Sequence, residues 1–119
     1  MARTAVPVQV TARTGVLFAA SGSEVAGDIV NGHEFVNDGA TYLYARNVDV
    51  VNPASITVLV GRTVDGQTVA SKVLSVTTNG QRLFGPWPVD VYNQPTAPTK
   101  VYFDVGDVDL RLSIWKLGG

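Results

Sequence analysis

The sequence contains one histidine and no cysteine, and these two counts limit the chemistry that its side chains could perform. A Ser-His-Asp triad would have to use His33 as its base. His33 follows the turn pair Asn31-Gly32, where we expect an exposed or half-exposed imidazole rather than a catalytic one. Without cysteine there is no disulfide framework, no zinc–thiolate site and no thiol nucleophile, and a single histidine argues against a catalytic zinc site.

Asp104, Asp107 and Asp109 form the one acidic cluster along the sequence. Calcium takes oxygen ligands from clustered carboxylates and backbone carbonyls. Residues 104–109 lack the ligand order of an EF-hand loop, so we interpret them as a hairpin turn with solvated carboxylates and leave calcium as the open alternative. The sequence also lacks a phosphate-binding loop, a nucleophile elbow and a metalloprotease motif. We therefore assign no catalytic residue, no metal ligand and no cofactor, and we expect no enzymatic activity.

The composition describes one domain that does not bind nucleic acid. The 119 residues are 45% hydrophobic and only 16% charged, with a net charge of −1. Nucleic-acid binding normally requires a basic face, and no apolar stretch approaches the roughly 20 residues that span a bilayer. Alternating valines replace the apolar core of a secretion signal near the start, so we expect no such signal. The low charge indicates that partner subunits cover part of the surface.

The elements that must position these side chains are β-strands. Valine is the commonest residue, and β-branched side chains favour the pleated surface of a sheet. Turn pairs that favour tight hairpins recur at Asn31-Gly32, Asp38-Gly39, Asp65-Gly66 and Asn79-Gly80. No stretch carries a helical period over three turns. The sequence therefore predicts an all-β, single-domain sandwich, with a jelly roll as the preferred form.

Short strands are expected at 6–11, 16–19, 29–36, 41–47, 55–60, 68–76, 81–84, 100–105 and 109–115. The strands 68–76 and 81–84 are predicted to form a hairpin, residues 89–92 to pair briefly, and 21–28 and 94–99 to be loops. Strand 55–60 is expected to lie deep, because both of its faces are largely apolar. Pro7 cannot donate to a ladder, so residues 1–13 are predicted to be an extended N-terminal arm or an edge strand, and residues 14–119 the sandwich.

The aromatic residues suggest a binding surface. Trp87 lies between Pro86 and Pro88, which force an extended segment outside the ladders. In the last strand Leu110, Leu112 and Ile114 are expected to point inward and Trp115 outward. Exposed aromatics commonly anchor interfaces, although Trp87 could instead plug one end of the sandwich and Trp115 cover an edge. The candidate interface residues are Arg3, Val6, Val8, Val10, Arg13, Trp87, Tyr92 and Trp115.

Several segments together resemble a known family. They are residues 31–39, 43–47, 63–66, 83–88, 92–94 and 101–103. The sharper part pairs Phe84-Gly85-Pro86 and Pro88 with the following Tyr92-Asn93-Gln94. The order of these features resembles the small head-decoration (minor capsid) proteins of tailed bacteriophages, particularly phages of actinobacteria. The resemblance spans roughly residues 27 to 115.

The resemblance implies a structural virion protein with no catalytic residues. Such proteins bind the outside of the head after the shell expands, at junctions between major capsid subunits. The expected partners are the major capsid protein and further copies of the chain, with a trimer favoured because it matches three-fold positions. The expected location is the capsid exterior, after assembly in the host cytoplasm. Two alternatives stay open: a β-sandwich domain of a tail or fibre, and a small carbohydrate-binding module that uses an exposed tryptophan.

Overall fold

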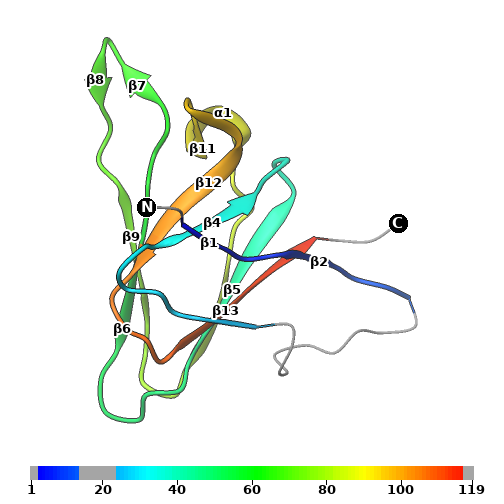
Figure 1. The fold of residues 1–119 in the computed structure, drawn as a ribbon, viewed down its shortest axis with the longest axis vertical. Coiled ribbons are helices and arrows are strands. Elements are labelled where there is room, and N and C mark those ends of the chain that lie inside the picture. The colour runs from blue at the N-terminus through cyan, green and yellow to red at the C-terminus, as the bar shows by residue number, and fades with distance from the viewer. Residues whose placement is uncertain (1–2, 14–23, 117–119) are drawn as a thin grey trace.

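The computed structural model describes residues 3–13 and 24–116, and these form two β-sheets packed face to face (Figure 1). The predicted all-β sandwich is confirmed. The first sheet has the order β1 (Thr4–Ala5), β4 (His33–Val36), β12 (Ala97–Val105), β6 (Ala54–Val58) and β9 (Lys72–Val76), with β11 (Asn93–Gln94) also paired to β12. The second has the order β10 (Gln81–Phe84), β5 (Thr41–Asn47), β13 (Leu110–Lys116) and β2 (Val8–Val10), with β3 (Val25–Ala26) also paired to β13.

The chain passes from one sheet to the other at most of its connections, and the core lies between the two layers. The inward prediction for β13 is confirmed, because Leu110, Leu112 and Ile114 are all fully buried. They pack in one cluster with residues of the opposite sheet, which include Phe35, Ile56, Val58, Val101 and Phe103. No helix in the described part of the chain is long and apolar enough to span a bilayer.

The turn pairs play different roles. Asp65-Gly66 closes a true hairpin between β7 (Thr63–Val64) and β8 (Gln67–Thr68), with φ of 50° and 76°, as a type I′ turn requires. The predicted hairpin around Asn79-Gly80 is wrong, because β9 pairs with β6 while β10 pairs with β5. The Gly80 N–H donates to the Thr77 carbonyl at 2.9 Å, and this tight turn redirects the chain between layers.

Other elements also differ from expectation. Residues 89–92 form the short helix α1 (Val89–Tyr92) instead of a pairing segment, and the predicted loops contain β3, β11 and the start of β12. The prediction that both faces of β6 are buried is wrong. One face is buried, whereas on the other Ser55 is exposed and Thr57 is half-buried. The predicted strand at 16–19 lies outside the described residues.

The N-terminal segment connects the two sheets. β1 runs parallel to β4 in the first sheet, and β2 runs parallel to β13 in the second. Between them Val6 is 2% exposed and belongs to the core, with its N–H donating to the Glu34 carbonyl at 2.9 Å. The described part of the predicted arm therefore contributes edge strands to both sheets.

Arg3 fixes the start of this segment. Its Nη1 lies 2.7 Å from Oδ1 of Asp104, and its guanidinium lies 4.6 Å from the ring centre of Tyr102. The ion pair passes directly over Gly32, where φ is +72° and a Cβ atom would come within 2.4 Å of both charged groups. Glycine is therefore required there by conformation and by space.

His33 is not an exposed turn residue, so that prediction is wrong. It is the first residue of β4, which lies between β1 and β12, and its side chain is fully buried and stacked on Phe103. Nδ1 lies 3.1 Å from the Thr4 carbonyl, and Nε2 accepts the N–H of Asp28 at 2.9 Å. These partners suit a neutral imidazole that carries its proton on Nδ1. Burial lowers the pKa of His33, with a smaller opposing effect from the Thr4 carbonyl.

We predict that acidification destabilises the fold through His33. The unfolded chain binds a proton near pH 6.5, whereas the folded chain resists it, because a second N–H on the imidazole would face the N–H of Asp28. The free energy of unfolding should be constant above that pH and fall below it, by at most about 1.4 kcal/mol per pH unit. Urea unfolding between pH 7.5 and 5 measures it.

The control is His33→Phe, which keeps a ring against Phe103 but cannot titrate. The variant should be less stable at neutral pH and should show no change in stability between pH 7.5 and 5. His33 is the single histidine of the chain, so no other side chain has an ordinary pKa in this interval. Equal pH dependence in both proteins would contradict the assignment.

Candidate functional site

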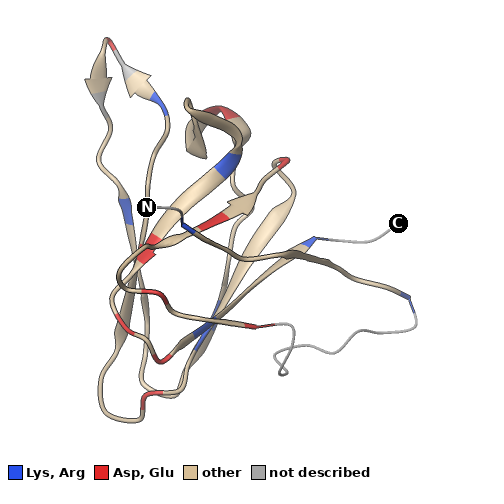
Figure 2. Cartoon of the chain, in the orientation of Figure 1, with Lys and Arg blue, Asp and Glu red and all other residues tan. Residues whose placement is uncertain are grey.

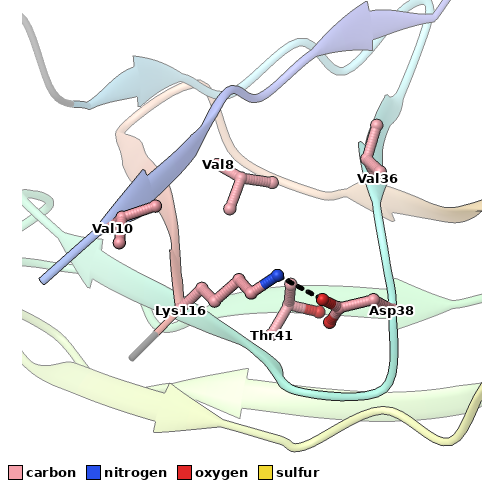
Figure 3. Close-up of a pocket in the computed structure, with 6 residues that line it drawn as sticks. All are labelled: Val8, Val10, Val36, Asp38, Thr41 and Lys116. Atoms are coloured by element: carbon pink, nitrogen blue, oxygen red, sulfur yellow. Dashed lines mark hydrogen bonds and ion pairs between the residues drawn. The ribbon is translucent and has the colours of Figure 1, made fainter. Parts of the chain in front are cut away.

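A groove lined mainly by valines opens at one side of the sandwich (Figure 3). We call it the valine groove, and its cavity volume is about 370 Å³. It is lined by Val8, Val10, Val36, Asp38, Thr41 and Lys116. Val10 and Val36 are each 53% exposed, so the groove presents apolar surface to solvent.

Strand register brings the groove residues together. In the parallel pair of β2 and β13, Val8 lies beside Ile114 and Val10 beside Lys116. In the antiparallel pair of β13 and β5, Lys116 lies opposite Thr41. Val36 ends β4 and is exposed, because alternation points it to the face opposite the buried His33 and Phe35. The groove is therefore the place where both sheets and the N-terminal segment meet.

One ion pair crosses the valine groove. The Lys116 ammonium points at the Asp38 carboxylate (Figure 3), and Asp38 also accepts the N–H of Ala40 at 3.0 Å. The hydrogen bond from Lys116 holds the pKa of Asp38 below its ordinary value, and the Ala40 N–H acts in the same direction. Both side chains remain more than 40% exposed, so the pair is reachable from solvent.

The polar side chains of the groove already have partners within the protein. They include no nucleophile–base pair, because Thr41 hydrogen-bonds to the Asn37 side chain and Lys116 pairs with Asp38. Exposed apolar surface beside polar groups is typical of a protein-binding surface. Two of the predicted interface residues, Val8 and Val10, lie in this groove. The others lie elsewhere: Val6 is in the core, Arg3 is paired with Asp104, and Arg13 is exposed outside the groove.

Both tryptophans are buried, so the outward prediction for Trp115 is wrong, and of the two alternatives for Trp87 the exposed anchor is wrong. Trp87 is 5% exposed and belongs to the core cluster, where the edge of its ring contacts Tyr92 at 5.1 Å between centroids. The Asn37 amide holds this segment by donating to the Trp87 carbonyl at 2.8 Å. Trp115 is also 5% exposed, and its Nε1 donates to Oγ of Ser113 at 2.9 Å.

The burial of the tryptophans follows from their positions in the fold. On the face of the sheet opposite Leu112 and Ile114, Trp115 lies between its cross-strand neighbours Tyr42 of β5 and Gln9 of β2, and it is 5% exposed there. Trp87 points inward from an extended segment. It therefore fits the alternative in which it fills one end of the sandwich, and not the one in which it is an exposed anchor. Neither ring presents the open face that stacking on a sugar requires.

The acidic cluster keeps two of the three predicted residues, Asp107 and Asp109. Asp104 pairs with Arg3, and Asp49 takes its place beside Asp107 and Asp109, with carboxylate oxygens within 4.8 Å of one another. These three residues are the ones in the described chain that could hold a divalent cation. Their oxygens also shape the loops, since Asp49 accepts the N–H of Val51 at 2.8 Å and Asp107 that of Asp109, also at 2.8 Å. Such backbone donors lower the pKa of Asp49.

Sequence reasoning missed four of the six groove residues: Val36, Asp38, Thr41 and Lys116. Asp38 was visible as part of a turn pair, but its partner Lys116 is 78 positions away. Only the register of β5 with β13 brings them together.

We predict that the groove can be altered without unfolding the protein. Val10→Ala removes a side chain that is 53% exposed, so the free energy of unfolding should change by no more than about 0.5 kcal/mol. The same substitution at Val6, which is 2% exposed, leaves a cavity and should cost about 1–3 kcal/mol. Urea unfolding of the two variants measures the difference, and equal losses would show that the groove is a structural element.

No family model, curated protein or solved structure matches this chain. The functional argument therefore depends on the residues and on the geometry of the valine groove.

Proposed function

We propose that the chain is a structural head-decoration protein of a tailed bacteriophage, which binds the outside of the expanded shell across junctions between major capsid subunits. The observation that carries the proposal is the valine groove, a half-exposed apolar surface that one ion pair crosses and that no catalytic group enters. The order of motifs along the sequence, which resembles such proteins, supports the same function.

The binding energy follows from the exposed side chains of the groove. Val10 and Val36 would be covered by the major capsid protein, and full burial of a valine side chain is worth about 1.5–3 kcal/mol. The Lys116–Asp38 pair would then give orientation more than affinity. A protein that binds the expanded shell alone stabilises that state by mass action, and many copies on one lattice strengthen the effect. A trimer of the chain suits three-fold positions on the capsid exterior.

We predict that the Val10→Ser/Val36→Ser variant folds normally but binds expanded particles at least tenfold more weakly than the unaltered protein. Replacing two apolar contact residues by polar ones removes the energy that covering them supplies. The measurement adds purified protein to expanded particles that lack it, separates the particles on a gradient and counts bound copies by quantitative mass spectrometry.

The matched control is Val69→Ser/Val73→Ser. Both valines are exposed, and Val73 lies on β9, at the edge of the first sheet farthest from β1. This variant should bind like the unaltered protein. Binding of both variants at the unaltered level would remove the groove from the interface.

The copy number tests the function itself. A simple ratio to the major shell protein on native particles would support decoration of the head. A handful of copies per particle would instead indicate a tail or fibre domain, and complete absence would overturn a role in the virion.

A further inference from the structure

The side of the sandwich away from the valine groove ends in an edge strand with one free edge. β10 (Gln81–Phe84) pairs only with β5 and forms the edge of the second sheet, across that sheet from β2. Gln81, Arg82 and Leu83 are exposed, and Leu83 is 59% exposed although it is apolar. The four residues pair with β5 in unbroken register, with no proline and no bulge. Such an edge is a template for another strand.

The hydrogen-bond pattern shows which backbone groups are free. The N–H of Asn47 donates to the Gly80 carbonyl at 2.9 Å, and Gly80 directly precedes β10. Because bonded and non-bonded pairs alternate in an antiparallel ladder, Arg82 and Phe84 are bonded to β5, opposite Ala45 and Leu43. The N–H and C=O groups of Gln81 and Leu83 therefore point away from the sheet, without a backbone partner among the described residues.

The free edge is also hollowed. A shallow groove with a cavity volume of about 500 Å³ follows β10, and it is lined by Thr77, Gly80, Gln81, Arg82, Leu83 and Phe84. Five of these six residues are consecutive, so the groove runs along the strand. An extended peptide laid beside β10 would follow this lining along its length.

The positive charges on this side of the sandwich favour an acidic binding partner. Arg82 is exposed and makes no ion pair with any described residue (Figure 2 shows the basic residues of the chain). Lys72, on the neighbouring free edge β9, is likewise exposed. If two copies paired antiparallel in the register that joins the outward groups of Gln81 in one copy to those of Leu83 in the other, Arg82 would lie opposite Arg82, and like charges directly opposite are unfavourable. A second copy is therefore disfavoured, and an acidic strand is favoured.

We propose that β10 accepts an extended acidic segment of a different polypeptide by β-strand addition. The added strand would bond to the outward groups of Gln81 and Leu83, place a carboxylate beside Arg82 and place an apolar side chain beside Leu83. This second interaction surface lies apart from the valine groove and does not depend on the proposed function.

The first measurement is amide hydrogen exchange by NMR, with and without the peptide Ac-Thr-Val-Glu-Val-Thr-NH2. In the free protein the amides of Gln81 and Leu83 should exchange quickly, and those of Arg82 and Phe84 slowly. Saturating peptide should slow exchange at Gln81 and Leu83 at least tenfold. Unchanged exchange at these two amides would overturn the proposal, as would protection that rises with protein concentration alone, because the occupant would then be a second copy.

The second measurement tests charge and backbone separately by titration. The unaltered protein should bind the glutamate peptide at least fivefold more tightly than Ac-Thr-Val-Lys-Val-Thr-NH2, and Arg82→Glu should reverse this order. Leu83→Pro removes an outward N–H that β5 does not use, so it should abolish peptide binding while the fold persists. Leu83→Thr, which keeps the N–H, is the matched control and should retain binding. An unchanged preference in Arg82→Glu, or full binding by Leu83→Pro, would refute strand addition.

Discussion

The passage of the N-terminal segment from one sheet to the other is the constraint on which the rest of the structure depends. Val6 enters the core at the crossing, while β1 and β2 extend the edges of different sheets. The crossing buries His33, because the Thr4 carbonyl and the Asp28 N–H occupy both of its ring nitrogens. It also forms one wall of the valine groove, through Val8 and Val10. The groove that we propose as a binding surface and a core that resists protonation thus depend on the same short stretch of chain.

The two sides of the sandwich differ as a result. On one side β1 and β2 cover the strands that would otherwise be edges, and the remaining gap is the valine groove. On the other side β9 and β10 are edge strands, each paired on one side only, and each carries one cation, Lys72 or Arg82. Basic residues on free edges are a common protection against pairing between copies. The chain can therefore present two surfaces of different chemistry, one apolar and one made of backbone and charge, without aggregating through its edges.

The sequence was sufficient for properties that depend on local pattern. β5 spans the predicted residues 41–47, and alternation placed Leu110, Leu112 and Ile114 in the core. The sequence was insufficient where the structure depends on how strands far apart in the chain pair with one another. Whether Asn79-Gly80 closes a hairpin or links the two sheets depends on which strands pair with β9 and β10. Strand pairing far along the chain likewise brings Asp49 next to Asp107. Trp115 looked exposed because alternation gives the face of a strand but not what covers that face.

The parallel pairing of β2 with β13 has a consequence for synthesis. Arg3 and Asp104, which fix the N-terminal segment, are 101 positions apart, and β13 is made later still. β2 must therefore wait until β13 has been made before it can pair, whereas β1 can pair earlier with β4. Closing so long a loop is slow, and contacts of this kind are expected late in folding. Because β2 and Lys116 of β13 both line the valine groove, that surface forms only after β13 has been made, so a partner that recognises it would not engage shorter nascent chains.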